Sequence, residues 1–91
     1  MTATKHILLA LVEDKPGVLN RMASVFRRRG FNIQSVNVLE TIETEDSERP
    51  GLTRVAIVVS GSAGNLGQVR KQLERIVDVV KVSDITARDA V

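Results

Sequence analysis

The 91-residue sequence contains no cysteine, no tryptophan and no tyrosine, and it has only two phenylalanines and one histidine. Without cysteine, a disulfide scaffold, a thiolate metal site and a cysteine nucleophile are all excluded. With so few aromatic side chains, the chain lacks the base-stacking platform that small RNA-binding domains carry on their central strands. We therefore expect no nucleic-acid partner.

Long hydrophobic runs and a strong excess of one charge are also missing. The longest apolar run, residues 7–12, is far too short to span a membrane, and the N-terminus does not resemble a secretory signal. The net charge is only +2, with acidic and basic residues spread along the chain. We expect a cytoplasmic protein without membrane contact. Residues 1–91 should form a single domain, with a core over about 5–85 and a tail over 86–91.

The inventory of catalytic side chains is thin. His6 lies at the start of an expected strand, where a lone histidine is far more often a surface or edge residue than a base or a ligand. The serines have no suitably placed histidine or lysine to activate them. The acidic residues within 43–48 indicate a solvated loop rather than a metal site. We therefore expect no catalytic residue, no metal and no cofactor on this chain.

Hydrophobic spacing predicts the order β-α-β-β-α-β. Strands are expected over 6–13, 31–41, 52–60 and 77–85, with helices over about 16–29 and 66–76 and a charged hairpin loop over 42–51. Right-handed crossovers then give an α+β fold, the ferredoxin-like sandwich, with an antiparallel sheet in the order 4-1-3-2 and both helices on one face. The first and third strands are continuously apolar, so they should be central and buried on both faces.

The second strand should then be an exposed edge, which is a candidate for self-association. The helix-free face of the sheet is also unusually apolar. Either a partner covers this face or its residues are partly exposed strand formers, and we slightly favour a partner.

The segment between the first strand and the first helix is the most informative part of the sequence. Pro16 suits the first helical position, and Gly30 suits the residue just past the helix end. The arginines at 27–29 would then interact favourably with the negative end of the helix dipole, a role that we prefer over a binding patch. Backbone N–H groups of Gly17, Val18 and Leu19 are unpaired in a first helical turn and could receive a carboxylate, while Asp14 could accept an ammonium. An ordinary Pro-Gly helix start is the alternative.

Three segments carry a family resemblance: E-D-K-P-G-V-L at 13–19, F-R-R-R-G-F-N-I-Q-S at 26–35 and Q-L-E-R-I-V-D-V-V-K-V at 72–82. Together they resemble the ACT domain of the small regulatory subunit of acetohydroxyacid synthase (acetolactate synthase), over about residues 5–85. The resemblance implies a non-catalytic subunit that activates the large subunit, which would carry thiamine diphosphate, Mg and FAD. It also implies feedback inhibition by valine or a related branched-chain amino acid.

In that family, ACT domains pair through their edge strands and the effector sits at the interface. The resemblance thus implies a homodimer through the second strand and first helix. The effector-binding residues carried over are Asp14, Lys15, Pro16, Gly17, Val18, Leu19, Asn32 and Ile33, with Asn32 contributed by the neighbouring protomer and Ile33 lining an aliphatic pocket.

Two departures from the family pattern stand out. The family often has asparagine where this chain has Asp14; a carboxylate there should hold an ammonium and repel a carboxylate, so the effector or its affinity could differ. Many small subunits also continue into a second domain, so this chain is either of the short class or truncated. A stand-alone ACT module that senses an amino acid for another enzyme or a transcription factor is the alternative function. A small ferredoxin-like enzyme is the third.

Overall fold

The computed structural model describes residues 4–42 and 51–86. In these residues the chain forms β1 (Thr4–Glu13), α1 (Val18–Arg28), β2 (Asn32–Ile42), β3 (Leu52–Gly61), α2 (Ala63–Glu74) and β4 (Val79–Asp84). The predicted order of elements is confirmed. Most of the predicted charged loop, residues 43–50, and most of the predicted tail, residues 87–91, lie outside the described residues.

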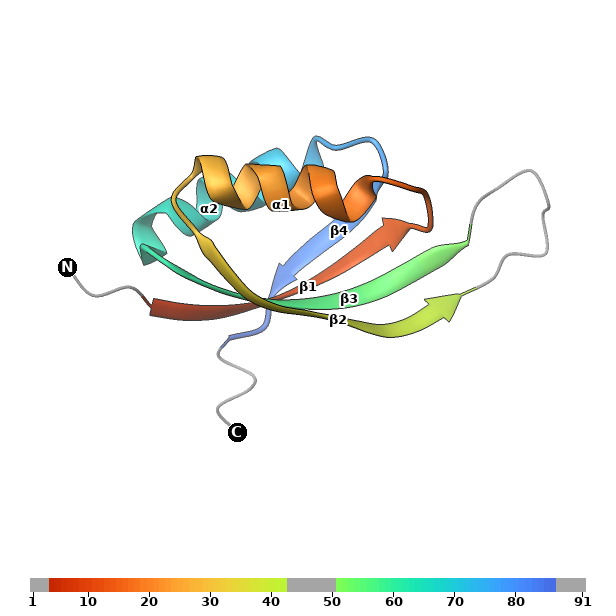
Figure 1. The fold of residues 1–91 in the computed structure, drawn as a ribbon, viewed down its shortest axis with the longest axis horizontal. Helices are drawn as coiled ribbons and strands as arrows, with labels where there is room; N and C mark the ends of the chain where they lie inside the picture. Colours follow the sequence, from red (N-terminus) through yellow and green to blue (C-terminus); the bar gives the residue numbers. More distant parts are fainter. Residues whose placement is uncertain (1–3, 43–50, 87–91) are drawn as a thin grey trace.

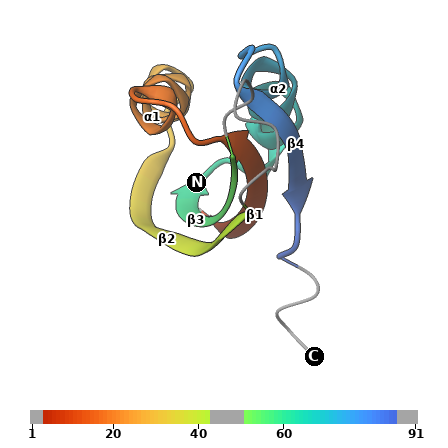
Figure 2. The ribbon, with the colours of Figure 1, turned by 90° about the vertical axis from the view of Figure 1, so that its right-hand side faces the viewer.

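The strands form one antiparallel sheet in the order β2-β3-β1-β4, which is the predicted order read from the other end. Both helices pack on one face of this sheet, with α1 on the β2 side and α2 on the β4 side (Figures 1 and 2). The ferredoxin-like sandwich is thereby confirmed. Among the described residues, no helix is long and apolar enough to cross a membrane.

The core lies between the sheet and the two helices. β1 and β3 are central, as predicted, but they are not buried on both faces. Along β1 the residues alternate: Leu8, Ala10 and Val12 are buried under the helices, whereas Leu9 and Leu11 on the other face are half-buried. Because the helices cover a single face, the continuous apolar run leaves the opposite face partly open within one chain.

Helix α1 begins two residues later than predicted. Gly17 has φ +84°, a left-handed conformation that cannot continue a helix, so Pro16 lies in the preceding turn and Val18 is the first helical residue. The predicted helix end is confirmed, because Gly30 is also left-handed, at φ +80°, and Phe31 N–H donates to the Phe26 carbonyl at 2.9 Å.

Helix α2 and strand β4 also differ from prediction at their ends. α2 begins at Ala63, three residues before Leu66, because Ser62 has the extended backbone of an N-cap and the following Gly64 is accommodated in the first turn. β4 begins at Val79, since Val79 N–H donates to the Ile76 carbonyl in a turn. Thr86, the first residue of the predicted tail, is bonded to β1, because its hydroxyl accepts a 2.9 Å hydrogen bond from Ile7 N–H.

His6 is not the surface or edge residue that the sequence predicted. Its side chain lies on the helix-facing side of central β1, is only 6% exposed and packs edge-on against Phe31, with ring centres 6.1 Å apart. Phe31 follows α1 directly and closes this end of the core. A Cβ at Gly61, the last residue of β3, would lie only 2.4–2.9 Å from the Phe31 ring.

The close approach of Gly61 to Phe31 predicts a clear stability effect. Gly61→Ala should destabilise the chain by about 1–3 kcal/mol, because the ring must move to admit a methyl group. Gly67→Ala is the matched control: a Cβ there meets nothing within 4 Å, and the helix interior favours alanine by roughly 0.5–1 kcal/mol. Urea unfolding checks both, and equal midpoints for the two variants would contradict the packing described for Phe31.

Candidate ligand pocket at the start of helix α1

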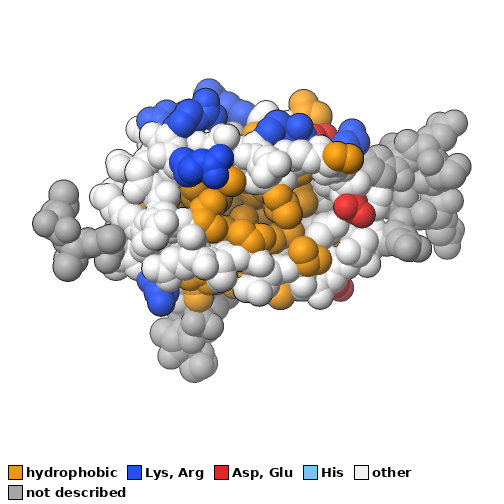
Figure 3. Space-filling model, viewed as in Figure 1, with side chains coloured by type: hydrophobic (Ala, Val, Ile, Leu, Met, Phe, Trp, Pro, Cys, Tyr) orange, Lys and Arg blue, Asp and Glu red, His pale blue; other side chains and the backbone are white. Residues whose placement is uncertain are grey.

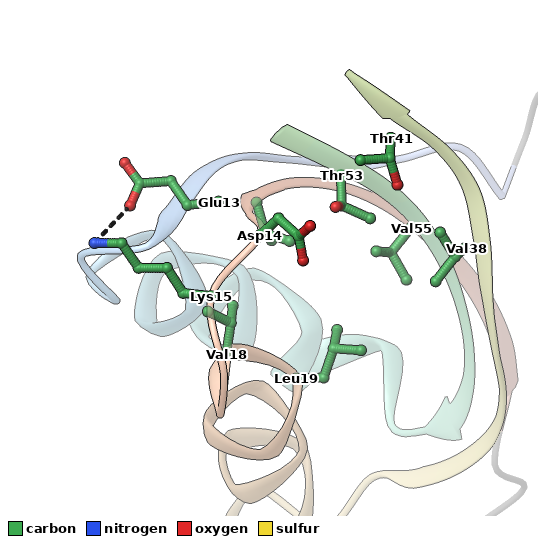
Figure 4. A pocket seen from close by; sticks show the side chains of 10 residues that line it. Glu13, Asp14, Lys15, Val18, Leu19, Val38, Thr41, Thr53 and Val55 are labelled. Carbon is green, nitrogen blue, oxygen red and sulfur yellow. Dashed lines mark ion pairs between the residues drawn. The ribbon is translucent and has the colours of Figure 1, made fainter. Parts of the chain in front are cut away.

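A cavity of about 270 Å³ opens between the end of β1, the start of α1 and the facing ends of β2 and β3 (Figure 4). Each of these elements contributes side chains to it. The lining residues are Val12, Glu13, Asp14, Lys15, Val18, Leu19, Val38, Thr41, Thr53 and Val55. The pocket therefore combines a mostly aliphatic wall with a charged and polar mouth, which is the usual make-up of a small-molecule site.

The loop between β1 and α1 is held from both sides by backbone hydrogen bonds. Glu13 N–H donates to the Asp78 carbonyl at 2.7 Å, and Asp14 N–H donates to the Gly51 carbonyl at 2.8 Å. Lys15 N–H turns back onto the Glu13 carbonyl at 2.9 Å. Because the loop is fixed to both neighbouring segments, the Asp14 side chain is presented from a preorganised backbone.

Ion pairs at the pocket mouth leave one carboxylate available. The Lys15 ammonium lies 3.2 Å from a Glu13 carboxylate oxygen and 3.4 Å from one of Asp78, and Arg21 also pairs with Asp78. The hydrogen bond and charge of Glu13, followed by those of Asp78, raise the pKa of Lys15 above its ordinary value. Asp14 is exposed, and none of the ion pairs among the described residues involves it, so within that part of the chain its carboxylate is placed to receive a ligand's cation.

The first turn of α1 supplies hydrogen-bond donors. Within the described residues, no backbone partner is found for the N–H groups of Gly17, Leu19 and Asn20, whereas Val18 N–H makes a long 3.5 Å bond to the Lys15 carbonyl. Open N–H groups at a helix start favour an anion. Two of the three donors named from the sequence, those of Gly17 and Leu19, are thus available.

The structure brings only some of the predicted site residues together. Asp14, Lys15, Val18 and Leu19 line the pocket, while Pro16 and Gly17 form the adjoining turn without lining it.

Asn32 and Ile33 stand at the far end of the sheet. Asn32 pairs with Ser60 on β3, whereas the pocket lies at the end where Leu52 pairs with Glu13. Within one chain, these two residues do not reach the pocket.

Sequence reasoning missed the half of the pocket that β2 and β3 contribute. Val38, Thr41, Thr53 and Val55 are brought to the β1–α1 loop by strand register, which a sequence pattern does not specify. One signal was available. Thr53 begins a row on the helix-facing side of β3 that continues with aliphatic residues, and a buried hydroxyl in such a row needs a polar partner.

A comparison with known families identifies the family of the chain. The family model of the AHAS small subunit-like ACT domain, where AHAS stands for acetohydroxyacid synthase, matches residues 8–81. The chain belongs to this family. The match runs from β1 into β4 and therefore includes all the elements that line the pocket of this ACT domain.

Curated relatives carry the same family name. The chain is 47% identical over 85 residues to a probable acetolactate synthase small subunit of Methanothermobacter thermautotrophicus, covering 93% of the chain and 47% of that protein. It is 50% identical over 82 residues to one of Archaeoglobus fulgidus, covering 90% of the chain and 48% of that protein. The chain thus spans about half the length of the curated relatives it matches.

Solved structures include another small subunit of this family and a more distant ACT domain. The acetolactate synthase small subunit from Thermotoga maritima superposes with a TM-score of 0.68 at 43% identity, covering 89% of this chain and 47% of that one. The ACT domain of a GTP pyrophosphokinase from Chlorobium tepidum superposes with a TM-score of 0.67 at 18% identity, covering 91% of this chain and 99% of that one. The second likeness shows the fold alone.

The edge of this ACT domain carries an exposed apolar surface. Figure 3 shows hydrophobic side chains gathered in the hollow between α1 and the β2 edge. Val36 and Val38 pair with buried Ile57 and Val55, so they point to the helix side of the sheet, yet they remain 45% and 58% exposed. We call these two residues, together with the exposed Leu19 on the neighbouring helix α1, the β2 edge surface. These three side chains remain exposed within one chain.

Proposed function

We propose that this chain is the regulatory ACT domain of an acetolactate synthase small subunit, and that its pocket binds a branched-chain amino acid such as valine. The observation that carries the proposal is the Asp14 carboxylate at the mouth of an aliphatic pocket, next to N–H groups at the α1 start, neither of which has a partner among residues 4–42 and 51–86. A free amino acid needs those three features together. The ammonium would pair with Asp14, the carboxylate with the Gly17 and Leu19 N–H groups, and the branched side chain with Val12 and Val55.

We further propose that the site is completed by a second copy of the chain. β2 is an edge strand that pairs with β3 on one side and, among the described residues, with no strand on the other, and the β2 edge surface beside it is apolar and exposed. Pairing two copies through β2 and α1 would bury this surface. It would also give Asn32 and Ile33, which lie far from the pocket of their own chain, a route to the pocket of the partner.

The proposed macromolecular partner is the catalytic large subunit. The names of the relatives support this assignment, because they are small subunits of acetolactate synthase. Thiamine diphosphate, Mg and FAD would then be bound by the large subunit. In the described residues of this chain, no group of three or more histidine, aspartate or glutamate side chains is placed to hold a metal ion. The role assigned to this chain is to bind the effector and alter the activity of its partner.

Mixing the purified chain with an acetolactate synthase large subunit, and measuring acetolactate formation with and without L-valine, tests this function. We expect the chain to raise the activity and valine to lower it. Calorimetric titration of the chain alone with L-valine distinguishes this function from that of a stand-alone ACT module. Binding of valine without any effect on the large subunit would favour an ACT module that serves another enzyme. No binding and no effect would contradict the proposal.

A further inference from the structure

Thr53 lines the pocket and carries a hydroxyl for which no partner is found among the described residues. The residue lies near the start of β3, is only 8% exposed and lines the cavity. Its Oγ1 is buried, and no hydrogen bond to it is found in the described part of the chain. Burying a hydroxyl without a partner is costly, so native structures rarely do it unless the group has a role. The residues that follow on the same side of β3, Val55 and Ile57, show that an aliphatic side chain fits this row.

Thr53 and Asp14 lie on neighbouring segments at the same end of the sheet. Thr53 pairs with Val12 on β1, two residues before Asp14, and Asp14 N–H is bonded to Gly51, two residues before Thr53. Figure 4 shows the Thr53 hydroxyl turned to the side of the pocket where the Asp14 carboxylate lies. The neighbouring β1 and β3 segments therefore hold a carboxylate and a hydroxyl oxygen toward the same part of the cavity.

We infer that Thr53 Oγ1, which is closed off from solvent in the unliganded chain, becomes a direct polar contact when a ligand enters the pocket, accepting a hydrogen bond from the ligand's ammonium beside Asp14. An ammonium has three N–H donors and no acceptor, so a carboxylate and a hydroxyl oxygen can both receive from it. A ligand carboxylate at this point would be repelled by Asp14. The inference rests on the proposed function and makes it more specific: the pocket selects a primary amine, not only a branched aliphatic acid.

The test uses a pair of variants of the whole 91-residue chain. Thr53→Val keeps nearly the same shape and removes the hydroxyl, whereas Thr53→Ser keeps the hydroxyl. We expect Thr53→Val to weaken L-valine binding about tenfold, since it removes a hydrogen bond to a charged group. Thr53→Ser should bind within about threefold of the parent, the usual range for retained polar contacts. Calorimetry measures each dissociation constant.

A second readout separates a ligand contact from a structural role. Without ligand, Thr53→Val should melt at the same temperature as the parent or a few degrees higher, because it removes an unpaired buried hydroxyl and valine suits a strand. A lower melting temperature would show that the hydroxyl stabilises the fold, and would overturn the inference whether or not valine binds.

The 2-keto analogue of valine, which lacks the ammonium, completes the experiment. It should bind the parent far more weakly than L-valine, and Thr53→Val should not weaken it further. Unchanged valine affinity in Thr53→Val, or an equal loss in Thr53→Ser, would overturn the role of the hydroxyl. Absence of valine binding in the parent chain would instead contradict the proposed function, while the melting comparison would still test Thr53.

Discussion

Replacing Gly17 with aspartate should abolish L-valine binding and leave the chain folded. The substitution adds a carboxylate beside the open N–H groups of the α1 start, where the ligand carboxylate is proposed to sit. Two carboxylates there would repel each other, so we expect an affinity loss of at least about 100-fold, in the range found when a like charge is placed in a binding site. Calorimetry measures the binding, and circular dichroism measures the fold.

The control for Gly17→Asp is the same change at the other end of the helix. Gly30 has nearly the same backbone conformation, φ +80° against +84°, and an added Cβ there meets nothing within 4 Å. Both aspartates would carry a left-handed backbone penalty of roughly 1–2 kcal/mol. Gly30 follows the other end of α1, away from the N–H groups that are proposed to bind the ligand carboxylate, so Gly30→Asp should bind valine normally. Equal losses in the two variants would attribute the effect to backbone strain and remove the assignment of the site.

Introducing a lysine at Val36 should convert the proposed dimer to a monomer and weaken the proposed binding of valine with it. Val36 is 45% exposed on the helix side of the edge strand, and it does not line the pocket. In the proposed dimer its side chain is buried, and a charge buried without a partner costs several kcal/mol. We expect at least a 100-fold weaker dimer by sedimentation velocity, converting that cost at 1.4 kcal/mol per tenfold.

Gln34→Lys is the matched control, because Gln34 is exposed on the same strand and already polar. It should keep both the dimer and valine binding. If Val36→Lys stays dimeric, β2 is not the dimer edge. If it becomes monomeric and still binds valine at the parent's affinity, each chain carries a complete site and the second copy is not needed.

The fold could be predicted because its determinants are local. Apolar runs identified β1 and β3 as central strands, and helical spacing with Gly30 fixed the end of α1. The start of α1 was misplaced because Pro16 satisfies the rule for a first helical residue, while the left-handed backbone of the next residue, Gly17, overrides it. His6 was misjudged for a similar reason, since residue type alone does not reveal that Phe31 covers it.

The candidate site could be predicted only on the side that is contiguous in sequence. Asp14 and Leu19 belong to one loop and helix start, so a local pattern found them. Thr53 and Val38 reach the same cavity through the pairing of β3 with its neighbours. The pairing of β2 with β3 also shifts register after Ile33 and after Val38. Because of these shifts, the spacing of residues in the sequence does not predict which side chains lie opposite each other.

The central claim is that an amino-acid site is formed between two copies of this chain, with Gly17 in one and Asn32 in the other. Valine binding to an equimolar mixture of the Gly17→Asp and Asn32→Ala variants tests it most directly. Each variant alone should bind no valine measurably, and the mixture should regain about a quarter of the parent's sites, because half of the dimers are mixed and each has one intact site. A mixture that regains no binding, or an Asn32→Ala variant that binds like the parent, would contradict the claim.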